Sequence, residues 1–177
     1  LGVTVEREGS DLLVNGTGGE FAIPLHPIDC RASGTTMRFL AACAALVRGR
    51  VVLDGVARMR ERPIQDLADA LTSLGVSART VAGCPPITIQ GGRLRGGRVA
   101  VDASKSSQFL SALLMVAPLA ESEVEIVSGK ITSRPYVDVT LSVMNAFGIS
   151  VELLGNDSFR IAGGQRYRTR SYAIEPD

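Results

Sequence analysis

The chain has 177 residues, of which 45% are hydrophobic and 21% are charged, and its formal net charge is +1. These values are ordinary for a globular protein of one or two domains, and they give no basis for binding nucleic acid or an anionic membrane surface. No apolar run approaches the roughly 20 residues that span a bilayer, and no signal peptide is recognisable, so we expect a cytoplasmic protein with no membrane partner.

The sequence repeats itself at a fixed interval. A large apolar residue followed by glycine and a β-branched residue occurs at three places, and the glycines Gly2, Gly75 and Gly148 lie 73 residues apart. Ser33 and Ser106, which each precede a run of small and apolar residues, have the same separation. Internal similarity at a fixed period indicates one structural unit per period. We therefore interpret the chain as an array of related units.

This period divides the chain into three parts. Residues 1–28 are predicted to be the tail of a first unit whose front, about 45 residues by the repeat length, is missing. Residues 29–101 form the second unit and residues 102–177 the third. We interpret the whole chain as a piece of a larger protein.

The elements of the second unit follow from caps, glycines and apolar spacing. They are a helix capped by Ser33, a strand at 50–54, a helix that begins at Pro63 and ends at Gly75, and strands at 76–81, 86–90 and 98–102. The third unit has a helix at 106–119, a strand at 123–127, a helix at 135–147, and strands near 149–153, 158–162 and 171–175. Each complete unit is therefore βαβαββ-like, and the glycine pairs at 91–92, 96–97 and 163–164 are interpreted as hairpin turns.

Polar residues precede the most apolar of these helices. Ser106 and Ser107 are natural N-caps, and Gln108 follows them directly. A helix that is apolar on nearly every face is a buried one, and its N-terminus presents free N–H groups and the positive end of the helix dipole. This arrangement favours a bound anion such as phosphate, although an ordinary cap on a core helix has the same pattern.

Other residues suited to anions lie near the starts of other helices. Arg58, Arg60 and Arg62 alternate, so on an extended segment they would point the same way, toward a carboxylate or phosphate; a solvated basic loop is the alternative. Gly34 would let a ligand approach the backbone closely. Ser133 and Tyr136 precede or begin the helix at 135–147. If the units are related by rotation, these helix N-termini converge on one pocket.

Residues suited to metal or acid–base chemistry are few and scattered. Cys30, Cys43 and Cys84 are odd in number and show no C-x-x-C spacing, which argues against a disulfide framework or a zinc site. The single histidine, His26, precedes Pro27 and is interpreted as a solvated loop residue. No pair of carboxylates or Cys–His arrangement is apparent. The sequence therefore predicts no metal, no cofactor and no catalytic residue within this chain.

Several segments together resemble the EPSP synthase family, the 3-phosphoshikimate 1-carboxyvinyltransferases of the shikimate pathway. They are Ser-Gly-Thr-Thr-Met-Arg (33–38), Arg-Met-Arg-Glu-Arg-Pro-Ile (58–64), Ser-Ser-Gln-Phe-Leu-Ser-Ala-Leu-Leu-Met (106–115), Ser-Arg-Pro-Tyr-Val-Asp-Val-Thr (133–140) and Glu-Pro-Asp (175–177). The resemblance implies an inside-out α/β barrel lobe, made of βαβαββ units with buried helices and outward-facing sheets. It further implies that this chain is most of one lobe of a two-lobed enolpyruvyl transferase.

The resemblance also implies the ligands and their contacts. Shikimate 3-phosphate would be held by Ser106, Ser107, Gln108 and Ser133, with Tyr136 against its ring. Phosphoenolpyruvate would be held by Arg62, aided by Gly34 and Gln108. The partners are then these two small anions and the missing lobe, which would carry the acid–base residues. The fragment alone is expected to be inactive.

The chain departs from the family pattern at three places. Arg31-Ala32 occupies the place of the usual Gly-Asn, Phe39 that of a frequent proline, and Pro176 that of the usual glycine. The first two border Gly34, and they leave the geometry of the phosphoenolpyruvate site and the sensitivity to glyphosate open. Two alternatives also stay open: a lobe of UDP-N-acetylglucosamine enolpyruvyl transferase, and a non-catalytic anion-binding repeat module.

Overall fold

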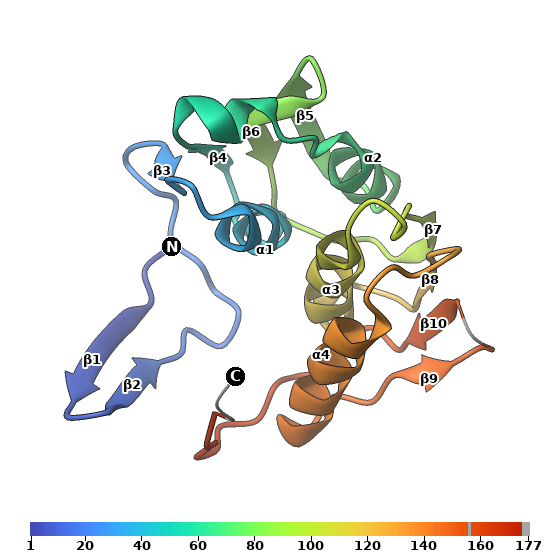
Figure 1. Cartoon of the computed structure of the whole chain (residues 1–177). Coiled ribbons are helices and arrows are strands. Elements are labelled where there is room, and N and C mark those ends of the chain that lie inside the picture. Colours follow the sequence, from blue (N-terminus) through green and yellow to red (C-terminus); the bar gives the residue numbers. More distant parts are fainter. Residues whose placement is uncertain (156, 175–177) are drawn as a thin grey trace.

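The architecture is mixed α/β, with helices in the interior and sheets at the periphery (Figure 1). We describe it from a computed structural model, and the description covers residues 1–155 and 157–174. In this part of the chain, two four-stranded sheets flank the helices, and a two-stranded hairpin of β1 (Thr4–Glu8) and β2 (Asp11–Asn15) projects away from them. None of the described helices combines the length and apolarity needed to cross a membrane.

The two sheets have the same topology. The first contains β3 (Ile28–Asp29), β4 (Arg50–Asp54), β5 (Ser77–Val81) and β6 (Cys84–Gln90) in the order β3-β4-β6-β5. The second contains β7 (Gly97–Ala100), β8 (Val124–Val127), β9 (Glu152–Leu153) and β10 (Ser158–Ile161) in the order β7-β8-β10-β9. In each, the first pair is parallel and the other pairs are antiparallel. The predicted α/β class with repeated βαβαββ order is confirmed.

The helices of each unit lie between the strands of its sheet in sequence. α1 (Gly34–Ala44) and α2 (Gln65–Ser73) accompany the first sheet, together with a short 3-10 helix, η1 (Ala57–Glu61). α3 (Ser107–Val116), its 3-10 extension η2 (Ala117–Leu119) and α4 (Arg134–Ala146) accompany the second. Strand β7 pairs with β8, so residues 97–100 hydrogen-bond into the second sheet although the sequence groups them with residues 29–101.

Helix α3 lies at the centre because nearly all its side chains are apolar. Phe109, Leu110, Leu113 and Leu114 are each at most 1% exposed. Helix α1 packs beside it through small residues, including Ala41, which allow close approach of the two backbones. The helix predicted from apolarity to be buried is therefore the core of the molecule.

Residues 73 positions apart form the same backbone hydrogen bond at three places in the chain. The amide of Ala22 donates to the carbonyl oxygen of Leu1 at 3.0 Å, that of Arg95 to Leu74 at 2.9 Å, and that of Arg168 to Phe147 at 2.8 Å. Each accepting carbonyl belongs to the residue before a glycine with positive φ, which in the second and third cases ends α2 and α4. Residues 1–28 thus share this one hydrogen bond with the corresponding segments after α2 and α4.

The glycine pairs predicted as hairpin turns have a different role, and that interpretation was wrong. The β5–β6 hairpin turns at Ala82 and Gly83, whereas residues 91–97 cross from one sheet to the other. A Cβ on Gly91 would lie 2.3, 2.6 and 2.7 Å from the carbonyl oxygens of Ala44, Val47 and Ala45. Gly163 likewise lies against the backbone of Ser122. These glycines let the chain pass close to the end of a helix.

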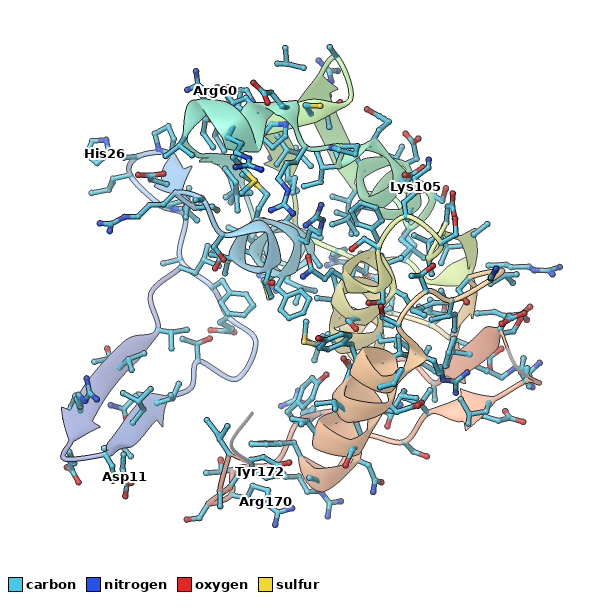
Figure 2. All side chains as sticks on the ribbon, viewed as in Figure 1. Asp11, His26, Arg60, Lys105, Arg170 and Tyr172 are labelled. Atoms are coloured by element: carbon cyan, nitrogen blue, oxygen red, sulfur yellow. The ribbon has the colours of Figure 1, made fainter. Side chains whose placement is uncertain are left out.

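Some other predicted elements also differ from those observed. Helix α2 begins at Gln65 rather than at Pro63, because Arg62 is extended before the proline and Ile64 is the N-cap. Residues 171–174 form no strand; instead the Tyr172 ring packs 5.7 Å from that of Phe147, at the C-terminal end of α4 (Figure 2). Residue 175, like the rest of the Glu-Pro-Asp segment with Pro176, is outside the described residues.

One departure from the family pattern has a conformational cost. Arg31 has φ +49°, in the left-handed region, where its amide donates to Asp29 and its carbonyl accepts from Val56. A side chain in this region destabilises the folded state by about 1–2 kcal/mol. Glycine would remove this cost, but it loses more conformational entropy on folding, so only part of the free energy is regained. We expect Arg31→Gly to raise the free energy of unfolding by about 0.5–1 kcal/mol in urea denaturation. Arg48→Gly, an exposed arginine without positive φ, is the control and should not stabilise.

Candidate anion-binding site at the helix N-termini

The N-termini of α1 and α3 are joined through the side chain of Gln108. Its Oε1 accepts from Nη1 of Arg38 at 2.8 Å, and its Nε2 donates to Oγ1 of Thr35 at 2.9 Å. Because a guanidinium can only donate, the amide end of Gln108 that faces Arg38 must be its oxygen. Gln108 is thereby held in one orientation between the two helix ends.

The other two helices begin in the same region. Oγ1 of Thr132, just before α4, donates to the carbonyl oxygen of Ser104, just before α3, at 2.8 Å. Lys105 lies between α2 and α3 (Figure 2), and its Nζ is 3.1 Å from Oδ2 of Asp66 in the first turn of α2. The N-termini of α1, α2 and α4 are therefore each linked to that of α3, and the positive ends of their dipoles favour an anion there.

The predicted serines occupy distinct places at these ends. Ser106 is the N-cap of α3, and its Oγ accepts from the amide of Gln108 at 3.3 Å, while Ser107 is the first helical residue and is 8% exposed. Ser133 is the N-cap of α4 with φ +62°, and its side chain makes no cap hydrogen bond. Tyr136 lies in the first turn of α4, and its ring is open to solvent, with the residue 70% exposed.

Two guanidinium groups converge on Gly34, the first residue of α1. A Cβ added there would lie 2.6 Å from Nη1 of Arg62 and 2.7 Å from Nη1 of Arg38. Within residues 1–155 and 157–174, neither arginine forms an ion pair with a carboxylate. Burial, and then the charge of Arg62, lower the pKa of Arg38. Two like charges close together, one of them desolvated, would be stabilised by an anion placed between them.

The three arginines near α2 do not share a face, contrary to the prediction. Residues 57–61 form η1 instead of an extended segment, so the alternation no longer aligns the side chains. Arg60 turns to Asp54, with Nε–Oδ1 and Nη2–Oδ2 distances of 2.9 and 2.6 Å, and its hydrogen bond lowers the pKa of Asp54. Of Arg58, Arg60 and Arg62, it is Arg62 that lies beside Gly34.

Two residues of this site were not singled out from the sequence. Arg38 is 7% exposed, lies 5.1 Å over the ring of Phe109 and makes the contact to Gln108. Thr35 makes the other contact to the same amide. A charged residue four positions after Gly34, within a run of small and apolar residues, was the available signal. Burying an arginine in a core helix costs free energy unless its charge is paired or hydrogen-bonded.

Known proteins resemble this chain along its whole length. The sequence model of the EPSP synthase (3-phosphoshikimate 1-carboxyvinyltransferase) family matches residues 1–177. The 3-phosphoshikimate 1-carboxyvinyltransferase of Methanoculleus marisnigri is 47% identical over 181 residues, covering 100% of this chain and 43% of the relative. A chloroplastic enzyme of the same name from Nicotiana tabacum is 44% identical over 192 residues, covering 100% of this chain and 37% of the relative.

The fold is similar as well. The structure of EPSP synthase from Acinetobacter baumannii superposes with a TM-score of 0.83 at 27% identity, covering 94% of this chain and 37% of that one. The chain thus spans roughly two fifths of the length of these relatives. Its full-length match to the family sequence, on a fold shared with a solved member, shows that it belongs to the EPSP synthase (3-phosphoshikimate 1-carboxyvinyltransferase) family.

Proposed function

We propose that this chain is the shikimate 3-phosphate-binding lobe of an EPSP synthase. The parent protein would transfer the enolpyruvyl group of phosphoenolpyruvate to the 5-hydroxyl of shikimate 3-phosphate. In that reaction the hydroxyl loses its proton as its oxygen bonds to C2 of phosphoenolpyruvate and C3 gains a proton. The C2–O bond to phosphate then breaks as C3 loses a proton, which re-forms the double bond. The observation that carries the proposal is the linkage of the N-termini of α1, α2 and α4 to that of α3, together with two arginines at Gly34 that no described carboxylate neutralises.

The proposed contacts follow the chemistry of each group. The hydroxyls of Ser106, Ser107 and Ser133 and the amide of Gln108 hold the phosphate of shikimate 3-phosphate. The Tyr136 ring lies against its carbocycle. For phosphoenolpyruvate, Arg62 binds the carboxylate in a bidentate manner, and Gln108 assists. Gly34 leaves room for it, since any side chain there would meet both guanidinium groups.

The remaining functions belong to the rest of the parent protein in this proposal. A second lobe closes over both substrates, excludes water and supplies the acid–base residues. The chain alone is therefore inactive and needs no cofactor. We place the protein in the cytoplasm, with the two anionic substrates and the second lobe as its partners.

An amide-resolved NMR titration with shikimate 3-phosphate tests this function. We expect saturable shifts at residues 106–108 and at Ser133, and none with UDP-N-acetylglucosamine. Ser107→Ala should weaken binding by roughly tenfold, because a hydrogen bond to a charged phosphate is lost. Ser73→Ala is the matched control, since that hydroxyl bonds only to the Asp69 carbonyl at the other end of α2. A well-folded spectrum that does not respond, or that responds only to the nucleotide sugar, would contradict the proposal.

A further inference from the structure

A pair of hydroxyl groups, that of the buried Ser111 and that of the half-buried Thr140, links α3 to α4. Ser111 is 3% exposed within the apolar helix α3, and its Oγ lies 2.9 Å from Oγ1 of Thr140 on α4. Oγ1 of Thr140 also donates to the carbonyl oxygen of Tyr136 at 2.9 Å. Since the single hydroxyl proton of Thr140 is used in that bond, Ser111 donates to Thr140. A directed chain of hydrogen bonds therefore runs from the middle of α3 to the first turn of α4.

Stability alone does not account for this pair. Buried hydroxyls cost free energy unless they are hydrogen-bonded, and a pair of apolar side chains of the same shape would pack here at little or no loss. What a buried polar contact adds to an apolar helix–helix interface is a fixed axial register, because sliding either helix breaks the hydrogen bond. Ser111–Thr140 is a part-buried contact of this kind, placed between the most buried helix and its neighbour.

The register set by this pair reaches the site directly. Ser107 lies one turn before Ser111 on the same face of α3, and Tyr136 lies one turn before Thr140 on α4. The Thr132–Ser104 hydrogen bond joins the same two helices just ahead of their first turns. Two polar contacts thus fix the N-terminus of α4 relative to that of α3.

We propose that Ser111 and Thr140 are positioning residues: they hold Ser133 and Tyr136 of α4 at the distance from residues 106–108 that lets one ligand contact both helices. This inference rests on the proposed function, because the ligand in question is shikimate 3-phosphate. Neither hydroxyl touches the ligand. Their effect is carried by the relative placement of two helix N-termini.

The test compares variants that separate the hydroxyl from the shape of the side chain. Thr140→Val removes the hydroxyl and keeps the volume, whereas Thr140→Ser keeps the hydroxyl. Thr72→Val is the matched control: Oγ1 of Thr72 donates to the carbonyl of Ala68 at 2.8 Å, which is the same local bond on α2. In the NMR titration with shikimate 3-phosphate, Thr140→Val should weaken binding about 3- to 10-fold. Thr140→Ser and Thr72→Val should stay within about twofold of the unmodified chain.

A measurement without ligand separates this inference from the proposed function. In the free chain, Thr140→Val should move the amide signals of residues 106–108 and 133–136, and Thr72→Val should not. If the unmodified chain binds and Thr140→Val binds equally well, the inference fails while the function stands. If the unmodified chain does not bind, the proposed function fails. The inference is then decided by whether Thr140→Val moves the amide signals of residues 106–108 and 133–136 in the free chain. Should Thr140→Val not fold, Ser111→Ala removes the same cross-helix bond and should give the same changes.

Discussion

Substitution of Arg38 by methionine should weaken binding of phosphoenolpyruvate by about 10- to 100-fold, because charged hydrogen bonds contribute about 1.5–3 kcal/mol. Arg38 and Arg62 both approach Gly34, so removing one leaves the anion a single guanidinium. The loss also frees Oε1 of Gln108, whose orientation Arg38 determines. Both effects act on the same ligand.

The stability of the Arg38→Met variant should change much less than its affinity for phosphoenolpyruvate. Burial and the charge of Arg62 disfavour the charged form of Arg38, as the lowered pKa of Arg38 shows, so the folded chain gains little from that charge without an anion. A methionine of similar length fills the same space over Phe109. We expect the free energy of unfolding to change by less than about 1 kcal/mol, as is common when a buried charge is replaced by an apolar side chain.

The measurement is calorimetric titration with phosphoenolpyruvate, in the presence of shikimate 3-phosphate, alongside urea denaturation. Arg48→Met removes one positive charge from an exposed position and serves as the control for net charge. It should bind as the unmodified chain does. Unchanged binding by Arg38→Met would show that this arginine is only a structural link to Gln108, and a large loss of stability would show that its charge is compensated in the folded state.

Substitution of Gly91 by alanine should destabilise the fold by about 3 kcal/mol, which is the upper part of the range for forced overpacking. The added methyl would lie within 2.7 Å of three backbone carbonyl oxygens at the C-terminal end of α1, none of which can rotate away as a side chain would. The hydrogen bonds from Gly91 to Gly49 and from Gly92 to Ala45 hold the same segment in place. The backbone must therefore shift for the methyl to fit.

Gly16→Ala supplies the control for this experiment. Nothing lies within 4 Å of a Cβ at Gly16, and its φ is not in the positive range. Alanine there should be neutral or slightly stabilising, through the entropy of the unfolded chain. Equal midpoints of urea denaturation for the two variants would mean that the close approach at Gly91 is not a determinant of stability.

Local signals in the sequence predicted the parts of the fold that local interactions determine. Ser33 and Ser106 are the N-caps of α1 and α3, as their hydroxyls and the following apolar runs indicated. Gly75 and Gly148, both with positive φ, end α2 and α4. The repeat then predicted two units of equal topology, because a shared period requires the same elements in the same order.

Tertiary contacts explain what could not be predicted. An extended arginine segment and a 3-10 helix are both open to residues 57–61, and the choice depends on partners such as Asp54 on β4. The role of Gly91 depends on a helix end more than 40 residues earlier in the chain. The burial of Arg38 follows from the packing of α1 on α3, which no pattern within α1 specifies.

The roles of the candidate site residues remain predictions, but their placement has a clear origin. Capping residues lie at helix starts by local chemistry, and the repeat brings those starts together. The sequence alone therefore predicted that Ser106, Ser107 and Ser133 lie at helix starts, which is where α3 and α4 have them. It did not indicate that Thr35 and Arg38 would fix Gln108, since those contacts span 73 and 70 residues.

The hydrogen bond between Thr35 and Gln108 joins two positions separated by one full period of the sequence. Equivalent positions of two units thus meet face to face, as they would across the axis of a symmetric oligomer. In an oligomer of identical subunits, both positions would have to be the same residue. Covalent linkage of the units removes this constraint, so one side can be a threonine and the other a glutamine. A frame that is nearly symmetric can in this way present an unsymmetrical set of groups to a ligand that has no symmetry of its own.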